Sequence, residues 1–250
     1  MLEIRHEAMD TTADTQQAYN EVYAGEGILL RDSFYLWLIR LLNPQSGKSL
    51  LDISCGYGRL VTLARRQGLR ASGLDFAGEA VLRGQKESAQ SGWGVADGER
   101  LPLATASVDY ITHIGSLEHY QQPACGASEI ARILKPDGRA CILLPNAYGL
   151  LGNVRFVMSH GEIFDDGQPL QRYATRRTWE SLLEAGGLRI DKVVGYGEVE
   201  FPRTLKDVGW MLTRPIKLVR FVLAALTPIN LVNHFVFICS PATTSIKKMA

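Results

Sequence analysis

The sequence predicts an α/β fold in which a mostly parallel β-sheet is covered by helices on both faces. Strand and helix patterns alternate from about Ser49 to Leu144. A tight turn with two glycines, Gly56 and Gly58, separates the first strand from the helix that follows it. Apolar residues make up 46% of the 250-residue chain, which is ample for one large core. Such alternation is typical of right-handed strand–helix–strand crossovers within one domain.

Two helices are predicted before the sheet, after an N-terminal stretch with no clear element. Residues 1 to about 13 show no clear element and are expected to be mobile. A helix is predicted over residues 14–23, with Asp14 as its N-cap. A second, aromatic-rich helix is predicted over Asp32–Leu42. It should end before Pro44, because the residue that precedes a proline disfavours the helical conformation.

The alternating part of the chain comes next. Strands are predicted at residues 49–53, 70–74, 93–96, 108–112 and 139–144, and helices at residues 59–67, 77–89 and 123–134. Pro123 suits the first turn of its helix, where a backbone N–H group is not needed. Pro136, Asp137 and Gly138 are predicted to form a turn before the fifth strand.

The pattern changes after Pro145. We expect an irregular insertion, with a short helix near residues 152–158, to reach Leu170. A helix over residues 175–185 has Thr175 as its N-cap and is stopped by two glycines. The last elements are two closing strands, with a long apolar segment between them: residues 188–196, residues 234–240 and, between these, residues 198–233.

Charge and cysteine usage exclude some classes of protein. The net charge is +1, from 27 basic and 26 acidic residues, so no nucleic-acid partner is expected. The four cysteines show no CxxC spacing and supply no metal-binding set. Without an evident targeting segment, they predict reduced thiols in a cytoplasmic protein.

The nearly uncharged run 221–240 needs a separate interpretation. It has about the length of a membrane span, but Pro228, Asn230 and Asn233 interrupt it, so we favour a helix over about 215–226, a turn and a buried strand. Three roles stay open for the stretch 210–232. It could contact a membrane surface, with basic residues at the headgroups, or form a lid or a dimer helix. The basic residues are Arg214, Lys217 and Arg220.

Residues 50–60 favour a ligand-binding turn over a purely structural one. Bare N–H groups at a glycine turn before a helix can hold a nucleotide-like ligand. A dinucleotide-binding turn needs a third glycine where Arg59 stands, which disfavours a nicotinamide oxidoreductase. The turn, with Asp52 before it, instead resembles the first motif of class I S-adenosylmethionine-dependent methyltransferases. Ser54 replaces the first glycine of that motif.

Acidic residues end three successive predicted strands: Asp52, Asp75 and Asp97. In an open parallel sheet these positions share the edge where ligands bind. Asp75 lies 19 residues after Gly56 and is well placed to accept hydrogen bonds from both ribose hydroxyls. Asp97 could accept from an adenine amino group, and Gly98 would let the backbone approach the ring.

Later motifs extend the resemblance over about residues 48–146. These are Leu117-Glu118-His119 and the series from Glu129 to Gly138, in which Asp137 replaces a usual glycine. The series resembles the methyltransferase subfamily that includes ubiquinone/menaquinone-type and many sugar, lipid and natural-product enzymes. It implies S-adenosylmethionine as cofactor and a Rossmann-like sheet of seven mostly parallel strands, with the last strand antiparallel.

The resemblance also implies residue roles. Cofactor-binding residues would be Asp52, Ser54, Gly56, Gly58, Asp75, Phe76, Asp97, Gly98, His113 and Ile114. The candidate bases for a hydroxyl acceptor are His119 and His113. Candidate acceptor-site residues are Asn146, Tyr148, Arg172, Tyr173, Tyr19 and Tyr23. The parts of the single domain would be a helical cap (1–44), the cofactor-binding core (45–146), an acceptor-site insertion (147–174) and a closing region (175–250).

The resemblance thus predicts methyl transfer to a small-molecule, lipid or saccharide-precursor acceptor by a cytoplasmic enzyme, with peripheral membrane contact if residues 210–232 bind lipid. The apolar stretch 210–232 favours a lipid-like acceptor. The alternative is a non-catalytic module that keeps the fold and binds a partner. The sequence leaves the acceptor atom and the oligomeric state open.

Overall fold

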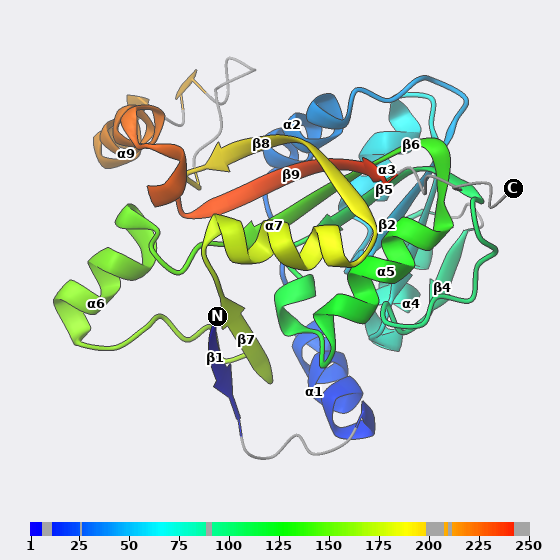
Figure 1. The fold of residues 1–250 in the computed structure, drawn as a ribbon, viewed down its shortest axis with the longest axis horizontal. Coiled ribbons are helices and arrows are strands. Elements are labelled where there is room, and N and C mark those ends of the chain that lie inside the picture. The colour runs from blue at the N-terminus through cyan, green and yellow to red at the C-terminus, as the bar shows by residue number, and fades with distance from the viewer. Residues whose placement is uncertain (7–11, 26, 89–91, 199–207, 210–211, 243–250) are drawn as a thin grey trace, which may run out of the picture.

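The computed structural model describes residues 1–6, 12–25, 27–88, 92–198, 208–209 and 212–242, and its centre is a seven-stranded sheet (Figure 1). The strands are β2 (Ser49–Ile53), β3 (Arg70–Asp75), β4 (Trp93–Val95), β5 (Val108–Ile114), β6 (Leu134–Pro145), β8 (Leu188–Tyr196) and β9 (His234–Pro241). Their order across the sheet is β4-β3-β2-β5-β6-β9-β8. Neighbouring strands are parallel except at β9, which is antiparallel to both β6 and β8. The predicted seven-stranded sheet with an antiparallel last strand is confirmed.

Helices cover both faces of this sheet. They are α1 (Thr12–Ala24), α2 (Asp32–Leu42), α3 (Arg59–Arg66), α4 (Gly78–Glu87), α5 (Pro123–Ile133), α6 (Arg155–His160), α7 (Arg176–Ala185) and α9 (Pro215–Leu226). One apolar core lies between the sheet and α5 with α7, and a second lies between the other face and α2 with α3. Side chains alternate across a strand, so adjacent residues pack into opposite cores. In β2, Leu51 packs into the first core and Leu50 into the second.

The predicted helix boundaries hold closely in most of the chain. Helix α2 spans the predicted residues, and α7 has Thr175 as its N-cap, with the Thr178 N–H donating to its hydroxyl at 3.3 Å. The first helix is an exception. It begins at Thr12, so Asp14 lies in the first turn and is not the N-cap. A carboxylate in the first turn still stabilises the positive end of the helix dipole.

The first residues are not as predicted, because Leu2–Arg5 forms a strand, β1. It pairs antiparallel with β7 (Leu170–Tyr173), which begins where the predicted irregular insertion ends. The Arg172 guanidinium, which is buried, donates to Glu3 at 2.8 Å and joins the two strands by charge as well. Neither strand is long or apolar enough to be evident alone, so only their pairing reveals them.

The predicted turn at residues 136–138 falls within β6, at a place where these residues leave the regular pairing with β5. Val108 pairs with Leu134, and Tyr110 pairs with Arg139, so four residues of β6 face one residue of β5. The excursion places the Lys135 ammonium 3.0 Å from the Asp109 carboxylate, at the edge opposite the ligand-binding one.

The apolar segment before β9 contains α9, which spans the predicted residues. Among the described helices, none is long and apolar enough to cross a membrane. The side chains of Lys217 and Arg220 lie outside the described set, as does Trp210 at the start of the predicted membrane-contact stretch. The insertion 146–170 carries a π-helical turn at Leu150–Val154 followed by α6, near the predicted short helix.

Candidate functional site

The chain turns sharply between β2 and α3. Ser54, Gly56 and Gly58 all adopt left-handed conformations, with φ of +57°, +52° and +68°. Glycine adopts this region freely, whereas serine is strained there. A Cβ on Gly58 would also come within 1.9 Å of the Trp93 ring, so no other residue fits that position. The start of α3 has no side-chain cap, which is typical of a helix end that receives a ligand.

Asp75 ends β3 directly beside this turn. Its carboxylate accepts hydrogen bonds from the Gly56 N–H at 2.7 Å and the Ala77 N–H at 2.9 Å. Burial raises the pKa of Asp75 to about 6, although these bonds favour the charged form. Each carboxylate oxygen keeps a second lone pair, so two ligand hydroxyls can still donate to it. The residues therefore fit the ribose of an adenosyl group.

The other two carboxylates differ from Asp75. Asp52 is buried one position before the end of β2, where it accepts from the Thr112 hydroxyl at 2.6 Å. Burial raises the pKa of Asp52 to about 7, and nearby Asp75 adds to the shift. Asp97 is exposed after β4, and its Oδ1 accepts from the Glu99 N–H at 2.9 Å. All three lie at the carboxyl edge of parallel strands, but Asp52 is buried and bonded to Thr112 of β5.

Tyr120 fills the space beside Gly98. A Cβ on Gly98 would lie 1.8 Å from the Tyr120 hydroxyl, so glycine at this position admits the tyrosine. From the sequence, we expected the adenine ring to approach the backbone at Gly98. The Tyr120 hydroxyl is also 3.0 Å from Ser54 Oγ and 2.9 Å from His113 Nε2. The Tyr120 side chain therefore touches three segments predicted to bind the cofactor, at Ser54, Gly98 and His113.

Helix α1 lies over this edge of the sheet. A Cβ on Gly56 would be 3.1 Å from the Tyr23 hydroxyl, and Gln16 Nε2 donates to the Phe76 carbonyl at 2.8 Å. The Tyr19 hydroxyl is buried without a hydrogen-bond partner among the described residues. Burial raises the pKa of both Tyr19 and Tyr23, with Asp75 among the contributing charges. The two tyrosines thus lie at the carboxylate edge, not at the cavity described next.

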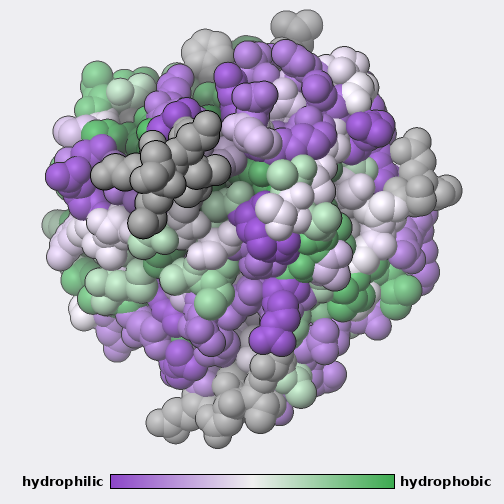
Figure 2. Space-filling model, turned by 45° about the vertical axis from the view of Figure 1, so that its right-hand side comes forward, coloured by the Kyte–Doolittle hydropathy of each residue, from purple (hydrophilic) through white to green (hydrophobic). Residues whose placement is uncertain are grey.

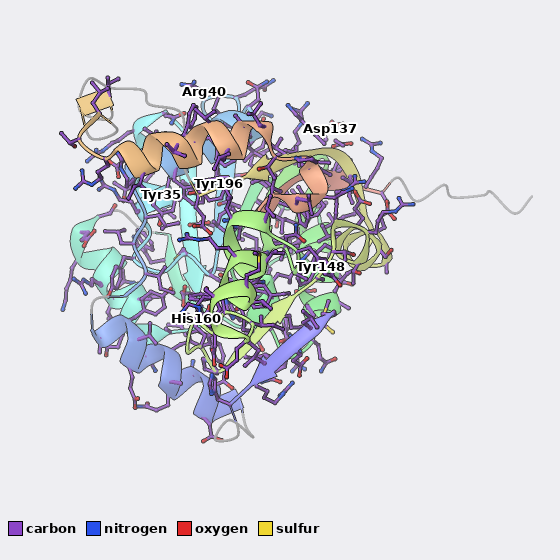
Figure 3. The ribbon with its side chains drawn as sticks, turned by 90° about the vertical axis from the view of Figure 1, so that its left-hand side faces the viewer. Tyr35, Arg40, Asp137, Tyr148, His160 and Tyr196 are labelled. Carbon is purple, nitrogen blue, oxygen red and sulfur yellow. The ribbon has the colours of Figure 1, made fainter. Side chains whose placement is uncertain are left out.

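A large cavity of about 890 Å³ lies alongside this edge. Its lining combines apolar residues before and within α2 with residues from the ends of β5, β6, β8 and β9. The apolar part includes Ile28, Leu30, Phe34, Ile114, Leu143 and Leu151. Helix α6 contributes a further side, and Figure 3 shows α6 below α9, with Tyr196 between them and His160 at the lower end of α6.

His119 and Glu118 line this cavity from the short 3-10 helix Leu117–His119. His119 Nδ1 lies 2.5 Å from the Leu170 carbonyl, which anchors the ring to β7. Burial lowers the pKa of His119, so the imidazole is neutral near pH 7. Glu118 Oε1 is 4.0 Å from His119 Nε2. Glu118 was not a predicted site residue, because its position on the cavity wall depends on contacts with distant β7.

His113, the other candidate base, does not line the cavity. It is fully buried in β5, where Nε2 is 2.9 Å from the Tyr120 hydroxyl. Burial lowers its pKa to about 3. Ile114, the next residue, does line the cavity. Of the two histidines, the structure therefore brings only His119 to the cavity wall.

The predicted acceptor-site residues take different places. Asn146 and Tyr173 line the cavity, but both side chains are engaged in hydrogen bonds to the backbone. The Asn146 amide donates to the Val232 and Asn230 carbonyls. The Tyr173 hydroxyl donates to the Phe164 carbonyl. Tyr148 is exposed and is not part of the lining. Arg172 donates to the backbone carbonyls of residues 118, 120 and 121 and so holds the 3-10 helix in place. No group of metal-binding side chains gathers within the described ranges.

The fold and this carboxylate edge resemble the cofactor-binding core of class I S-adenosylmethionine-dependent methyltransferases. Residues 51–142 match the family model described as "Methyltransferase domain". The resemblance predicted from the sequence is confirmed for this part of the chain, and S-adenosylmethionine is the cofactor of such domains.

Similar proteins agree with this class. The ubiquinone/menaquinone biosynthesis C-methyltransferase UbiE of Rubrivivax gelatinosus is 33% identical over 108 residues, which cover 42% of this chain and 43% of that protein. The chain thus spans less than half the length of this relative. A solved S-adenosylmethionine-dependent methyltransferase from Mesorhizobium loti superimposes with a TM-score of 0.62 at 14% identity, covering 83% of this chain and 97% of the other. The [4+2]-cyclase SpnF has a TM-score of 0.61 at 16% identity, covering 93% and 97%, which shows a shared fold.

Proposed function

We propose that the protein transfers a methyl group from S-adenosylmethionine to a small-molecule acceptor bound in the large cavity. The observation that carries this proposal is the placement of two adjacent residues. Tyr120 contacts Ser54 in the glycine turn, while His119 lines the cavity. A cofactor at the turn and an acceptor in the cavity would therefore be neighbours, which a transfer reaction requires.

The residues at the turn would hold the cofactor. Asp75 would accept from the ribose hydroxyls, and Asp97 with Phe76 would contact the adenine side. The turn itself, from Ser54 to Gly58, would border the methionine part, above the buried Asp52. His113 and Ile114 would separate the cofactor from the acceptor. These roles rest on burial, backbone geometry and free acceptor capacity at Asp75.

The bound cofactor supplies a methyl group already activated on a sulfonium sulfur. The chain then needs to align the acceptor and exclude water, and alignment of this kind can contribute roughly 7–11 kcal/mol. His119 is the proposed base, since its neutral imidazole lines the cavity and is held by Leu170. Tyr173 and Asn146 would shape the acceptor site, while Tyr19 and Tyr23 would close the cofactor side.

An apolar, lipid-like acceptor is supported by the lining and by the surface nearby. Helix α9 exposes an apolar stripe made of Ile216, Val219, Leu223 and Leu226. These residues recur at spacings of three and four, so they share one helix face. The helix contains two basic residues and no acidic one. By contrast, hydrophobic residues on the face seen in Figure 2 are interspersed among hydrophilic ones.

We therefore propose that α9 lies on an anionic membrane surface beside the cavity. A helix with an apolar face and basic residues binds such a surface without crossing it. The segment carrying α9 follows Glu198 and leads to Asn233, both of which line the cavity. An acceptor dissolved in the membrane would thus have a short path to the site.

Two measurements test the main proposal against a non-catalytic module. Calorimetry should detect binding of S-adenosylmethionine and of S-adenosylhomocysteine. A labelled-methyl assay against fractionated cell extract, followed by mass spectrometry, should then reveal a labelled small molecule. Cofactor binding without any labelled product would favour the module, and absence of cofactor binding would refute both the cofactor assignment and methyl transfer.

A further inference from the structure

Three buried polar atoms with no hydrogen-bond partner belong to residues that line the large cavity. Among the described residues, Glu118 Oε2, Gln171 Oε1 and His234 Nδ1 have no partner. The Glu118 and Gln171 residues are only 4% and 3% exposed. Buried polar groups are nearly always paired, because an unpaired one costs free energy. Such groups on a cavity wall are therefore available to hydrogen-bond a ligand bound there.

The contact of His119 with the Leu170 carbonyl decides which ring nitrogen carries the hydrogen. A carbonyl oxygen can only accept, so the Leu170 carbonyl fixes the ring hydrogen on Nδ1, 2.5 Å away. Nε2 of the neutral ring must then carry a lone pair. The His119 side chain therefore presents a hydrogen-bond acceptor beside Glu118.

Glu118 supplies the opposite kind of group. Burial raises the pKa of Glu118 to about 8, and the negative charge of Asp166 shifts it in the same direction. Below that pH the carboxyl keeps its proton and can donate it. Its Oε1 lies 4.0 Å from His119 Nε2, so a donor and an acceptor stand side by side on the cavity wall.

We propose that the group methylated is a hydroxyl, bound with its hydrogen on His119 Nε2 and its oxygen accepting from Glu118. This inference rests on the proposed function. The Gln171 amide would bind a second polar group of the same acceptor. On transfer, the hydroxyl oxygen gains the methyl carbon that the sulfonium sulfur loses, and the hydroxyl proton passes to Nε2.

Other methyl-accepting groups match His119 and Glu118 less well. A hydroxyl is neutral and both donates and accepts, as the neutral His119 and Glu118 require. An ammonium group has no lone pair to accept from Glu118 and would carry a charge into a buried, neutral site. A thiol is a weak donor and a weak acceptor, and a carbon acceptor would leave the donor of Glu118 unpaired.

The test compares three ligands that share one apolar body: 4-hexylphenol, 4-hexylanisole and 4-hexylaniline. Their binding to the full-length protein is measured by calorimetry, with and without saturating S-adenosylhomocysteine. We expect the phenol to bind at least tenfold more tightly than the anisole, which cannot donate to His119, and more tightly than the aniline, whose neutral amino group is a weak acceptor. His119→Leu, which removes the acceptor of the phenol hydrogen, should reduce the preference over the anisole to less than threefold, whereas His119→Gln, which keeps an acceptor oxygen, should retain most of it. Glu118→Leu, which removes the donor to the phenol oxygen, should reduce the preference over the aniline.

Affinity for S-adenosylhomocysteine, measured on each variant, reports on folding and on the cofactor site separately. It should stay within twofold of the wild-type value. Equal affinity for phenol and anisole, tighter binding of the aniline, no phenol binding, or an unchanged preference over the anisole in His119→Leu would overturn the inference. Failure of the wild-type protein to bind S-adenosylhomocysteine would instead refute the proposed function, and the phenol preference would remain measurable without it.

Discussion

The Ser54 hydroxyl lies 3.0 Å from the Tyr120 hydroxyl, and this contact joins the glycine turn to the residue next to His119, which lines the cavity. Ser54 has φ of +57°, a conformation in which a non-glycine residue is strained. The hydrogen bond to Tyr120 offsets part of that strain. The contact therefore gives a physical reason why serine is tolerated where the related motif has glycine.

The first prediction is a double-mutant cycle on this pair. Tyr120→Phe should lower the free energy of unfolding by about 1–3 kcal/mol, because it leaves Ser54 and buried His113 without a partner. In a Ser54→Gly background the cost of Tyr120→Phe should be smaller by about 1 kcal/mol. Urea unfolding of the four proteins measures both quantities. Strict additivity of the two changes would show that the contact is not energetically coupled to the turn.

The second prediction concerns the ribose assignment. Asp75→Ala should weaken binding of S-adenosylhomocysteine at least tenfold, because two charge-assisted hydrogen bonds are lost. Asp109→Ala is a matched control, since this carboxylate binds Ser49 and Lys135 at the opposite edge of the sheet. It should lower stability without changing affinity. Calorimetry on both variants provides the comparison, and unchanged affinity in Asp75→Ala would remove the assignment.

The third prediction is the pH dependence of stability. The pKa of Glu118 is raised from 4.5 to about 8 in the folded protein, so the folded state holds a proton that the unfolded chain has released. Its stabilising effect is complete below pH 4.5 and is lost as the pH rises towards 8, by at most about 1.4 kcal/mol per pH unit. Between pH 7 and 8, His119 and His113 oppose this change only weakly, because burial keeps both neutral in the folded state and an unfolded histidine is already mostly neutral.

Glu118→Gln should therefore flatten the decline in unfolding free energy between pH 7 and 8. Asp52, with a pKa of about 7, should leave a smaller residual slope of the same sign. Arg172 and Asp166 also face this region. Denaturant unfolding at three pH values measures the slope. A wild-type protein whose stability rises with pH over this interval would contradict the prediction.

The fourth prediction tests α9 as a membrane-surface helix. The protein should sediment with vesicles of phosphatidylcholine and phosphatidylglycerol, and less so at high salt. Replacing Ile216 and Leu226, each 75% exposed, with serine should weaken binding about fivefold or more. Leu82→Ser is the control, because Leu82 is 51% exposed on α4. Equal loss in the control, or no sedimentation of the wild type, would rule out a specific role for α9.

Local sequence patterns were enough to predict most of the core. The turn at Gly56 and Gly58 could be recognised because left-handed backbone favours glycine, whatever surrounds it. Helix α2 was predicted to the residue and helix α9 to about its observed bounds, since apolar periodicity and flanking prolines act within a few positions. The pairing of β1 with β7 could not be predicted, because it joins residues 2–5 to residues 170–173.

The sequence by itself determined the order of elements in the seven-stranded sheet and the position of the carboxylates at the ends of β2 and β3, since both depend on short-range preferences of the backbone. Only the tertiary structure decided which polar groups share a cavity. His119 is oriented by Leu170, and Tyr120 occupies the space at Gly98. Contacts of this kind depend on the packing of segments that are far apart in the chain, and no local pattern encodes them.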